Sequence, residues 1–411
     1  MSKDNWKKVR LGDIIEINPV VPLTKGQEYS YILMDDVVPS RRYVNSTKKK
    51  VFTGGGARFK KGDVIFARIT PCLENGKISQ VKELETTEGF GSTEFFVFRN
   101  INGITDQSFV YYLAVSDLVR KPAEKSMSGA SGRQRANKST IENLKIEIPP
   151  LDIQKKIASI LSAYDDLIEI NTRRIKILEE MAHSIYREWF VKFRFPGHEK
   201  VKMVKSEIGM IPEGWEVYKA SDCIEINPMI KVEKDKPKPF VDMTCLSETS
   251  MIVNYKEYRT GSSGTKFQNG DTLFARITPC LENGKTGFVQ FLNEKEVGLG
   301  STEFIVLRSK NLSPEIVYLL ARTEDFRNNA IKSMTGASGR QRVQLECFEK
   351  YLLAKPPEAL IDKFTEVVRP MFQEVYILSI ENRKLRKTRD LLLPKLISGE
   401  IDVKNLNISG I

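Results

Sequence analysis

Two short runs, Gly132–Arg135 and Gly339–Arg342, read Gly-Arg-Gln-Arg and combine a flexible backbone with two guanidiniums and one amide. Guanidinium and amide side chains form directed, often paired hydrogen bonds with phosphates and with base edges. Their composition favours phosphate clamping or base contact, and a solvated loop before a helix is the alternative that stays open. The candidate DNA-binding residues in these runs are Arg133, Gln134, Arg135, Arg340, Gln341 and Arg342.

A second candidate group lies in a twelve-residue segment that occurs twice, at 66–77 and at 274–285, with the sequence Phe-Ala-Arg-Ile-Thr-Pro-Cys-Leu-Glu-Asn-Gly-Lys. This identity indicates an internal duplication. The Asn-Gly pairs predict tight hairpins, and the end of the segment is similar to a phosphate-binding loop that lacks its required first glycine. The identity would also be expected of a turn that the fold requires. The basic residues of the two copies are candidates for DNA contact: Arg68, Lys77, Arg276 and Lys285.

The two halves differ most in the runs 20–58 and 229–266, which precede the twelve-residue segments. Any difference in what the two halves bind is expected to reside in these runs. The basic candidates for DNA contact in these runs are Arg41, Arg42, Lys49, Arg58, Arg259 and Lys266.

The composition favours a polyanionic partner, because the 411 residues carry a net charge of +11 at a pI near 9.2. A merely basic surface is the alternative. The polar N-terminus and the absence of a long apolar run predict a cytoplasmic chain without membrane contact. Five scattered cysteines and two histidines disfavour a disulfide framework, a zinc site and histidine catalysis. No Asn-Pro-Pro-aromatic or Asp-Pro-Pro-aromatic run of an adenine methyltransferase occurs, so we expect binding and not catalysis.

The duplication has a period of about 209 residues and therefore repeats a whole domain. Each copy predicts an α+β domain with a mixed, twisted sheet, including strands near 63–69 and 94–99 and helices over 108–119 and 313–326. Two such domains are expected to be joined by two long antiparallel helices that form a coiled-coil spacer. The predicted boundaries are 1–150 and 196–356 for the domains, 151–195 and 357–400 for the helices, and 401–411 for a C-terminal tail.

The two helical segments carry heptad patterns over 153–193 and 360–397, which predict a coiled coil. An antiparallel register that places Asn171 against Asn382 also pairs Trp189 with Phe364. We expect this buried asparagine pair to penalise slipped registers. We also expect Pro370 to kink the second helix or to mark its start. Two unrelated amphipathic helices, each packed on its own domain, are the alternative.

Two local motifs accompany this domain–helix–domain–helix order. The run Ile148-Pro-Pro-Leu-Asp-Ile-Gln-Lys-Lys-Ile157 enters the first helix, and Asp390-Leu-Leu-Leu-Pro-Lys-Leu-Ile-Ser-Gly-Glu-Ile401 ends the second. With them, essentially the whole chain resembles the DNA-specificity (S) subunit of type I restriction–modification enzymes. The chain departs from that pattern at 357–359, where a glutamine equivalent to Gln154 is missing.

The resemblance implies a subunit without catalysis or bound cofactor that reads a bipartite double-stranded DNA target, one half-site per domain. If the two domains read different bases, we expect the difference to reside in the runs 20–58 and 229–266. If they read similar bases, the target approaches an interrupted palindrome. Two modification subunits would carry S-adenosylmethionine and adenine methylation, and motor and nuclease subunits that use ATP and Mg are further candidate partners. A helix of about 40 residues spans about 60 Å, so the coiled coil would act as a ruler for the unread bases. A DNA-binding adaptor without a methyltransferase and a coiled-coil scaffold whose heads bind protein are the competing interpretations.

Overall fold

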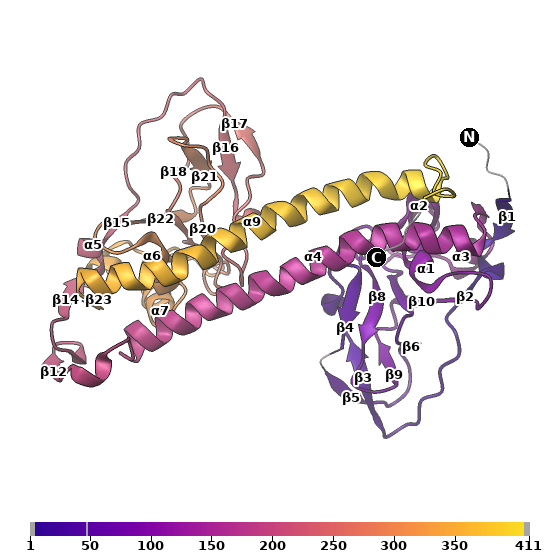
Figure 1. Cartoon of the computed structure of the whole chain (residues 1–411), viewed down its shortest axis with the longest axis horizontal. Coiled ribbons are helices and arrows are strands. Elements are labelled where there is room, and N and C mark those ends of the chain that lie inside the picture. The colour runs from indigo at the N-terminus through magenta and orange to yellow at the C-terminus, as the bar shows by residue number, and fades with distance from the viewer. Residues whose placement is uncertain (1–4, 47, 407–411) are drawn as a thin grey trace. The chain divides into compact units, whose positions relative to one another are not determined.

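The computed structural model describes residues 5–46 and 48–406, which divide into two compact units. Unit 1 comprises residues 1–169 and 382–411, and unit 2 comprises residues 170–381. Each unit contains part of both long helices, α4 (Leu151–Tyr186) and α9 (Glu358–Ile397). Both helices are labelled in Figure 1.

Unit 1 is built on two small mixed sheets. The larger has the strand order β2-β10-β7-β8-β4 and the smaller the order β5-β3-β9-β6, with one parallel pair in each, β4–β8 and β3–β9. The larger sheet consists of β2 (Ile15–Ile17), β4 (Tyr43–Asn45), β7 (Val64–Ala67), β8 (Ile78–Glu83) and β10 (Phe95–Asn100). The smaller consists of β3 (Glu28–Ile32), β5 (Lys49–Val51), β6 (Ala57–Lys60) and β9 (Glu88–Gly91).

The remaining elements of unit 1 cover and close these sheets. They are the strand pair β1 (Lys7–Arg10) and β11 (Lys145–Ile148), the 3-10 turns Leu11–Asp13 and Met34–Asp36, and the helices α1 (Gln107–Val115), α2 (Asp117–Lys125) and α3 (Lys138–Glu142). Strand β7 is buried on both faces because alternate side chains point to opposite sides. Phe66 joins the cluster that contains α1, α4 and α9 residues, and Ile65 joins the cluster of the smaller sheet.

Unit 2 repeats this plan. Its sheets have the orders β15-β22-β19-β20 and β17-β16-β21-β18, the latter mixed through the parallel pair β16–β21. The first consists of β15 (Ile224–Ile226), β19 (Thr272–Ala275), β20 (Thr286–Phe288) and β22 (Phe304–Ser309). The second consists of β16 (Lys238–Val241), β17 (Glu257–Arg259), β18 (Thr265–Phe267) and β21 (Gly298–Gly300).

Two further strand pairs and several short helices complete unit 2. The strand pairs are β12 (Met203–Ser206) with β13 (Gly209–Pro212), and β14 (Glu216–Lys219) with β23 (Leu352–Lys355). The helices are α5 (Ala220–Cys223), α6 (Pro314–Ala321), α7 (Glu324–Lys332) and α8 (Glu346–Lys350). The short turns are the π-helical Arg187–Val191 and the 3-10 turns His198–Lys200 and Met243–Cys245.

The strands expected near 63–69 and 94–99 are confirmed as β7 and β10. The two predicted single helices are wrong, because each is two helices separated at Ser116 or at Thr323. Ser116 and Thr323 both adopt extended backbone, and the Thr323 hydroxyl caps α7 by accepting from Phe326 N. Sequence periodicity did not detect this break, because apolar residues continue on both sides of it.

The long helices run antiparallel within each unit. In unit 2, Arg174 pairs with Glu374 and the expected ring contact of Trp189 with Phe364 is present at 5.6 Å. Helix α9 begins at Glu358 and continues through Pro370, so the expectation that Pro370 marks its start is wrong. A regular α-helix also ends earlier in α4 than the heptad pattern suggested, because residues 187–191 are π-helical.

A buried ion pair ties the strands together in both units and gives a stability prediction. Arg308 donates two hydrogen bonds to Asp271 at 2.8 and 2.6 Å, and Asp271 is 1% exposed; Arg99 and Asp63 repeat the pair in unit 1. Asp271→Asn leaves the guanidinium partly buried without its counter-ion, which costs about 3 kcal/mol. We expect the unfolding free energy of unit 2 to drop by the same amount. Hydrogen exchange of residues 272–275 measures this change. The exposed pair Lys176–Glu180 is the control: Glu180→Gln should change stability by less than about 1 kcal/mol. Equal losses would contradict the prediction.

Candidate nucleic-acid interface

The twelve-residue segment of unit 1 begins in the buried strand β7 and leaves the sheet at Arg68. Residues 70–76 then form a compact turn in which Asn75 N donates to Pro71 O at 2.9 Å. Gly76 ends the turn with a φ of +72°, a left-handed conformation that favours glycine, and Gly284 does the same in unit 2 at +81°. The prediction of a tight Asn-Gly hairpin is therefore wrong. The Asn-Gly pair closes a longer turn between two antiparallel strands.

The Gly-Arg-Gln-Arg run pairs with this segment, which joins the two candidate groups into one site per unit. In unit 1, Thr70 N donates to Gln134 O at 3.0 Å, and Gln134 N donates to Thr70 Oγ1 at 2.9 Å. In unit 2, Thr278 and Gln341 form the same two bonds at 3.1 Å each. The runs are about 60 residues apart in sequence, so spacing alone gave no sign of this pairing.

A glutamate holds the second arginine of each run in place. Arg135 donates to both carboxylate oxygens of Glu94, at 2.7 and 2.9 Å, and Arg68 Nε donates to Glu94 at 3.3 Å. Arg342 forms the same paired contact with Glu303. The hydrogen bonds from the arginine lower the pKa of each carboxyl, Glu94 by Arg135 and Glu303 by Arg342. These guanidiniums are therefore fixed in orientation while remaining about 45% exposed.

Glu94 and Glu303 were not singled out in the sequence. The signal that could have found them is the run Gly-Ser-Thr-Glu-Phe, which is identical in both halves, at 91–95 and 300–304. In unit 2, Arg276 Nε has no hydrogen-bond partner in the described part of the chain, unlike its counterpart Arg68. The two sites are thus similar but not identical.

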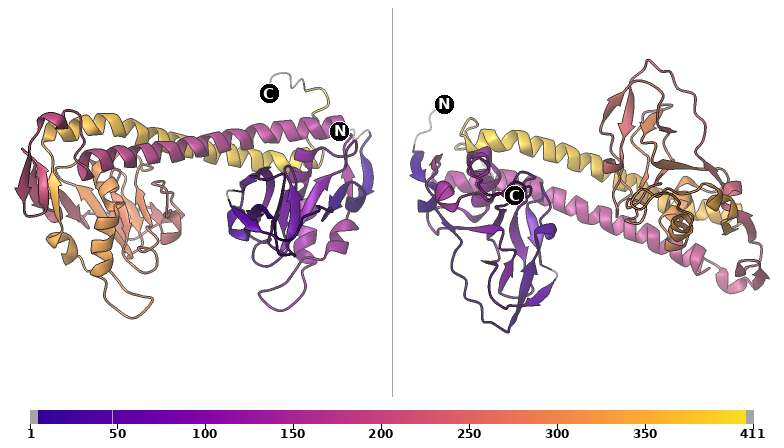
Figure 2. Two further views of the ribbon diagram at one scale, coloured as in Figure 1. Left: turned by 90° about the horizontal axis from the view of Figure 1, so that it is seen from below. Right: turned by 180° about the vertical axis from the view of Figure 1, so that it is seen from behind.

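The first arginine of each run lies on an exposed loop. Residues 128–133 and 335–340 are exposed throughout, and each loop projects from the body of its own unit (Figure 2). Glycines at 129, 132, 336 and 339 adopt positive φ angles that shape these loops. Neither Arg133 nor Arg340 has a side-chain hydrogen bond or ion pair with any residue among 5–46 and 48–406. These two guanidiniums are therefore available to an anionic ligand.

The lysines that end the twelve-residue segments make internal contacts instead. Lys77 Nζ donates to Met34 O at 2.9 Å, and Lys285 Nζ donates to Met243 O at 3.1 Å. Each bond holds the 3-10 turn that follows the central strand of the smaller sheet, β3 or β16. The lysine thereby connects the segment that both halves share to the run in which they differ. The structure thus gives both lysines a positioning contact.

Removing this contact should loosen the divergent run locally. Lys285→Met deletes the donor to Met243 O and leaves that carbonyl without its partner, which costs about 1–3 kcal/mol. We expect faster hydrogen exchange over residues 243–253, measured by mass spectrometry, with little change over residues 304–309. Lys295→Met, an exposed lysine in the same unit, serves as the control. Unchanged exchange over 243–253 would show that the bond does not hold the turn.

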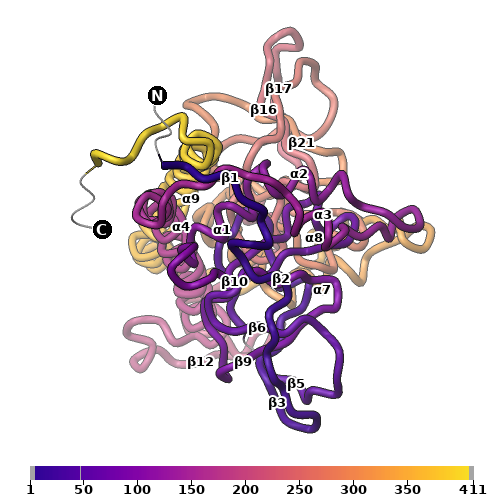
Figure 3. The backbone as a smooth tube through the Cα atoms, turned by 90° about the vertical axis from the view of Figure 1, so that its right-hand side faces the viewer, coloured from indigo at the N-terminus to yellow at the C-terminus, as the bar shows by residue number. Residues whose placement is uncertain are grey.

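The divergent runs supply the edges of the smaller sheets, β5 and β6 in unit 1 and β17 and β18 in unit 2. Strands β3 and β5 lie together at the margin of unit 1 (Figure 3). Every residue of β5 and of β17 is exposed. Cationic side chains there pair with acids, lie over aromatic rings or donate to a backbone carbonyl: Lys49 pairs with Glu85, Arg259 pairs with Glu257 and lies over Phe240, Arg58 lies over Phe52, and Lys266 donates to Gly264 O. Arg41 is exposed at the start of the segment that leads into β4.

Arg42, one of the residues predicted to contact DNA, is buried inside unit 1. Its side chain is 5% exposed and donates to Gln80, Tyr112, Ser108 and Ser162 inside unit 1. A buried guanidinium with four internal acceptors cannot reach DNA, so the prediction that Arg42 contacts DNA is wrong. The charge of Arg42 is evident from its residue type, whereas its burial depends on the side chains packed around it.

The two register asparagines are buried, Asn171 at 1% and Asn382 at 3% exposure. Asn171 Nδ2 donates to Glu381 Oε2 at 3.0 Å. The direct pairing of Asn171 with Asn382 stays a prediction.

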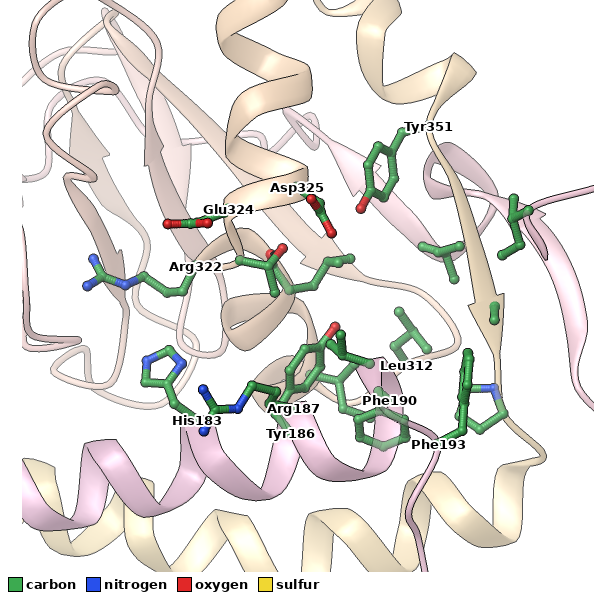
Figure 4. Close-up of a pocket in the computed structure, with 18 of the residues that line it drawn as sticks. His183, Tyr186, Arg187, Phe190, Phe193, Leu312, Arg322, Glu324, Asp325 and Tyr351 are labelled. Carbon is green, nitrogen blue, oxygen red and sulfur yellow. Dashed lines mark hydrogen bonds between the residues drawn. The ribbon is translucent and has the colours of Figure 1, made fainter. Parts of the chain in front are cut away.

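A cavity of about 990 Å³ lies in unit 2 between the end of α4 and the segment 312–325. His183, Arg187 and Phe190 from the α4 side face Arg322, Asp325 and Tyr351 across it (Figure 4). Burial lowers the pKa of His183 to about 4, with a further contribution from Arg322. No residue predicted to bind DNA lines this cavity, so it is separate from the interface described above.

Within residues 5–46 and 48–406, no cluster of His, Cys, Asp or Glu side chains is arranged to hold a metal ion. In the same ranges, none of the helices combines the length and apolar character that a bilayer crossing needs.

Comparison with known proteins identifies the family. The sequence model of the type I restriction modification DNA specificity domain matches residues 3–180 and 212–361. The chain belongs to this family. This chain is 26% identical to the type I restriction enzyme MjaIX specificity subunit of Methanocaldococcus jannaschii, and the match covers 98% of this chain and 95% of that protein. It is 22% identical to the HindI specificity subunit of Haemophilus influenzae, covering 97% and 100%.

A solved structure agrees with the fold. The type I restriction-modification S subunit from M. genitalium superposes on the specificity subunit with a TM-score of 0.55 at 14% identity, covering 96% of each chain. The two α+β domains and the antiparallel long helices predicted from the duplication and the heptads are therefore confirmed. The family consists of specificity subunits, so the chain is not the catalytic component of such an enzyme.

Proposed function

We propose that this specificity subunit reads a bipartite double-stranded DNA target, one half-site per recognition domain. The observation that carries the proposal is the repeated site. In each unit the twelve-residue segment and the Gly-Arg-Gln-Arg run are hydrogen-bonded to each other. The same loop carries an exposed arginine whose side chain has no partner among the described residues. Two copies of one cationic site on two domains suit a ligand that offers equivalent phosphates at two places.

The shared and divergent residues suggest a division of labour. Arg133 and Arg340 lie on loops that differ only at Ser128 and Thr335, and they would contact phosphates, which carry no sequence information. The strand edges β5–β6 and β17–β18 differ between the units and would contact base edges, where sequence is read. Lys49, Arg58, Arg259 and Lys266 lie on those strands. Lys77, Lys285, Arg135 and Arg342 would act by shaping the site.

The continuous helices supply the ruler. Helix α9 has 40 residues, which corresponds to about 60 Å at 1.5 Å per residue. At 3.4 Å per base pair, this length covers somewhat under two turns of DNA. A fixed coiled-coil length would thus set the number of unread bases between the half-sites.

Catalysis would reside in partner subunits. Two modification subunits, with S-adenosylmethionine, would methylate adenines in the half-sites, and restriction subunits that use ATP and Mg would join a cleaving complex. We expect this chain to bind none of these cofactors and to act in the cytoplasm, where the DNA is.

The test is co-expression of this chain with the modification subunit, followed by sequencing of methylated bases. We expect one bipartite methylated motif that disappears when this chain is omitted. Methylation that persists unchanged without the chain would exclude the specificity role. Retained assembly without any DNA binding would instead favour the scaffold whose heads bind protein.

A further inference from the structure

In each unit the domain packs on the two long helices through a surface whose residues correspond one to one between unit 1 and unit 2. Equivalent residues are offset by 209 at the N-terminal end of each domain, by 208 from Gly62 to Gln80, by 209 over residues 89–99 and by 207 from α1 onward. The backbone agrees: Gln80 N donates to Arg42 O at 2.6 Å, and Phe288 N donates to Met251 O at 2.9 Å. Arg42 and Met251 therefore occupy the same place in the two units.

In unit 1 this surface, the polar seat, is a buried hydrogen-bonded network. Arg42 donates to Gln80 Oε1 at 3.1 Å and to Tyr112 Oη at 3.3 Å, and Tyr112 donates to Asp165 Oδ2 at 2.7 Å. Arg389 forms an ion pair with Asp165 and donates to the carbonyl of Ser40 at 3.3 Å. All five members of the polar seat are 6% exposed or less: Arg42, Gln80, Tyr112, Asp165 and Arg389.

In unit 2 every equivalent position is apolar. Phe288 and Phe372 pack edge to face with ring centroids 5.0 Å apart, in the cluster that also contains Ala182. All five members of this apolar seat are 5% exposed or less: Met251, Phe288, Leu319, Phe372 and Ala182. Phe372 replaces Asp165, and Ala182 replaces Arg389.

A neighbouring pair of positions changes in a matched way. In unit 1, Ser108 and Ser162 both accept hydrogen bonds from Arg42, which lies between them. In unit 2 the equivalent residues are Glu315 and Arg369, which bind each other directly, with Arg369 Nε 2.8 Å from Glu315 Oε1. The domain side and the helix side have therefore changed together.

Mixing the two seats would be unfavourable in both directions. A domain carrying Met251, Phe288 and Leu319 on the helices of unit 1 would bury the Asp165–Arg389 ion pair against apolar side chains, without the hydrogen bond that Tyr112 donates to Asp165. A domain carrying Arg42 on the helices of unit 2 would bury a guanidinium against Phe372. Buried charge without compensation is among the largest single costs in folding.

We propose that the polar and apolar seats form a pairing code that assigns each recognition domain to its own part of the helix pair, with Arg42, Asp165 and Arg389 as positioning residues. The code acts through the packing of each domain on the two helices and does not require contact with DNA. If the domains read DNA, the code would also set the order of the two half-sites, and this consequence rests on the proposed function.

A chimera tests the code with natural domain surfaces. Residues 11–143 are replaced by residues 220–350, so that both domains are copies of the second. The chimera is made with unchanged helices and with matched helices, S162R/D165F/R389A. We expect the matched chimera to melt about 5 °C or more above the unmatched one. The same three changes in the intact chain should lower its Tm. A chimera that gains nothing from the matched helices would overturn the proposal.

Point variants cover the case in which neither chimera folds. The domain set R42M/Q80F/Y112L and the helix set D165F/R389A are measured separately and together in the full chain. Each set alone should lower Tm and speed hydrogen exchange over residues 157–169, and their combination should recover part of both losses. Losses that simply add would contradict the code. Arg42→Lys, which keeps the charge, should lose less than Arg42→Met.

Methylation by the matched chimera separates the code from the proposed function. With two copies of the second domain, the methylated motif should become an interrupted palindrome of the second half-site. Recovery of stability without such a motif would leave the pairing code standing and count against DNA reading by the domains. An unchanged bipartite motif would contradict both.

Discussion

Insertion of one heptad into each long helix should lengthen the spacer of the methylated motif by about three base pairs and leave both half-sites unchanged. Seven helical residues add about 10.5 Å, and about three base pairs of DNA have this length at 3.4 Å each. The insertions belong after Glu169 in α4 and after Glu381 in α9, where the two compact units meet along the chain. A heptad preserves the seam because the apolar pattern repeats every seven residues.

The measurement is sequencing of methylated bases after co-expression with the modification subunit. An insertion into α4 alone is the matched control, because it leaves the partner helix one heptad short and should abolish the motif without creating a new one. A double insertion that methylates the original spacing would contradict the ruler. The expected effect on the original target is loss of specific methylation, the largest change predicted for this protein.

Replacing both loop arginines, R133A/R340A, should weaken DNA binding by about 3–6 kcal/mol, or roughly 10²- to 10⁴-fold, because each charge-assisted hydrogen bond contributes about 1.5–3 kcal/mol. The loss should be similar on cognate and non-cognate DNA, since phosphate contacts carry no sequence information. The slope of log affinity against log salt should fall by about two. Fluorescence anisotropy over a range of salt concentrations measures both quantities.

The control for these arginines removes the same charge elsewhere. K176A/K395A deletes two exposed lysines of the long helices, Lys176, which pairs with Glu180, and Lys395, which pairs with Glu400 beyond the end of α9. This variant should change affinity less than threefold and leave the salt slope within about half a unit. If both double variants lose affinity equally, net charge and not the loops drives binding. If R133A/R340A loses affinity only for the cognate target, the loops read bases.

The architecture of this protein could be predicted from its amino-acid sequence. A twelve-residue identity, a period of about 209 residues and two heptad segments predicted two similar α+β domains and an antiparallel helix pair. These features are visible in sequence because strand burial and helix seams depend on local periodicity. The break between α1 and α2 was missed, since a change of direction at Ser116 depends on what the helices pack against.

The availability of each charged side chain depends on the tertiary structure and could not be predicted. Arg133 and Arg135 are two positions apart and both are exposed, yet Glu94 binds Arg135, and Arg133 has no side-chain partner in the described part of the chain. Thr70 and Gln134 meet because two loops of one domain are folded together. Arg41 and Arg42 are adjacent in the chain, but Arg41 is exposed and Arg42 is buried where the domain packs on the long helices. Charge is a property of the residue, whereas burial and partners depend on side chains distant in the chain.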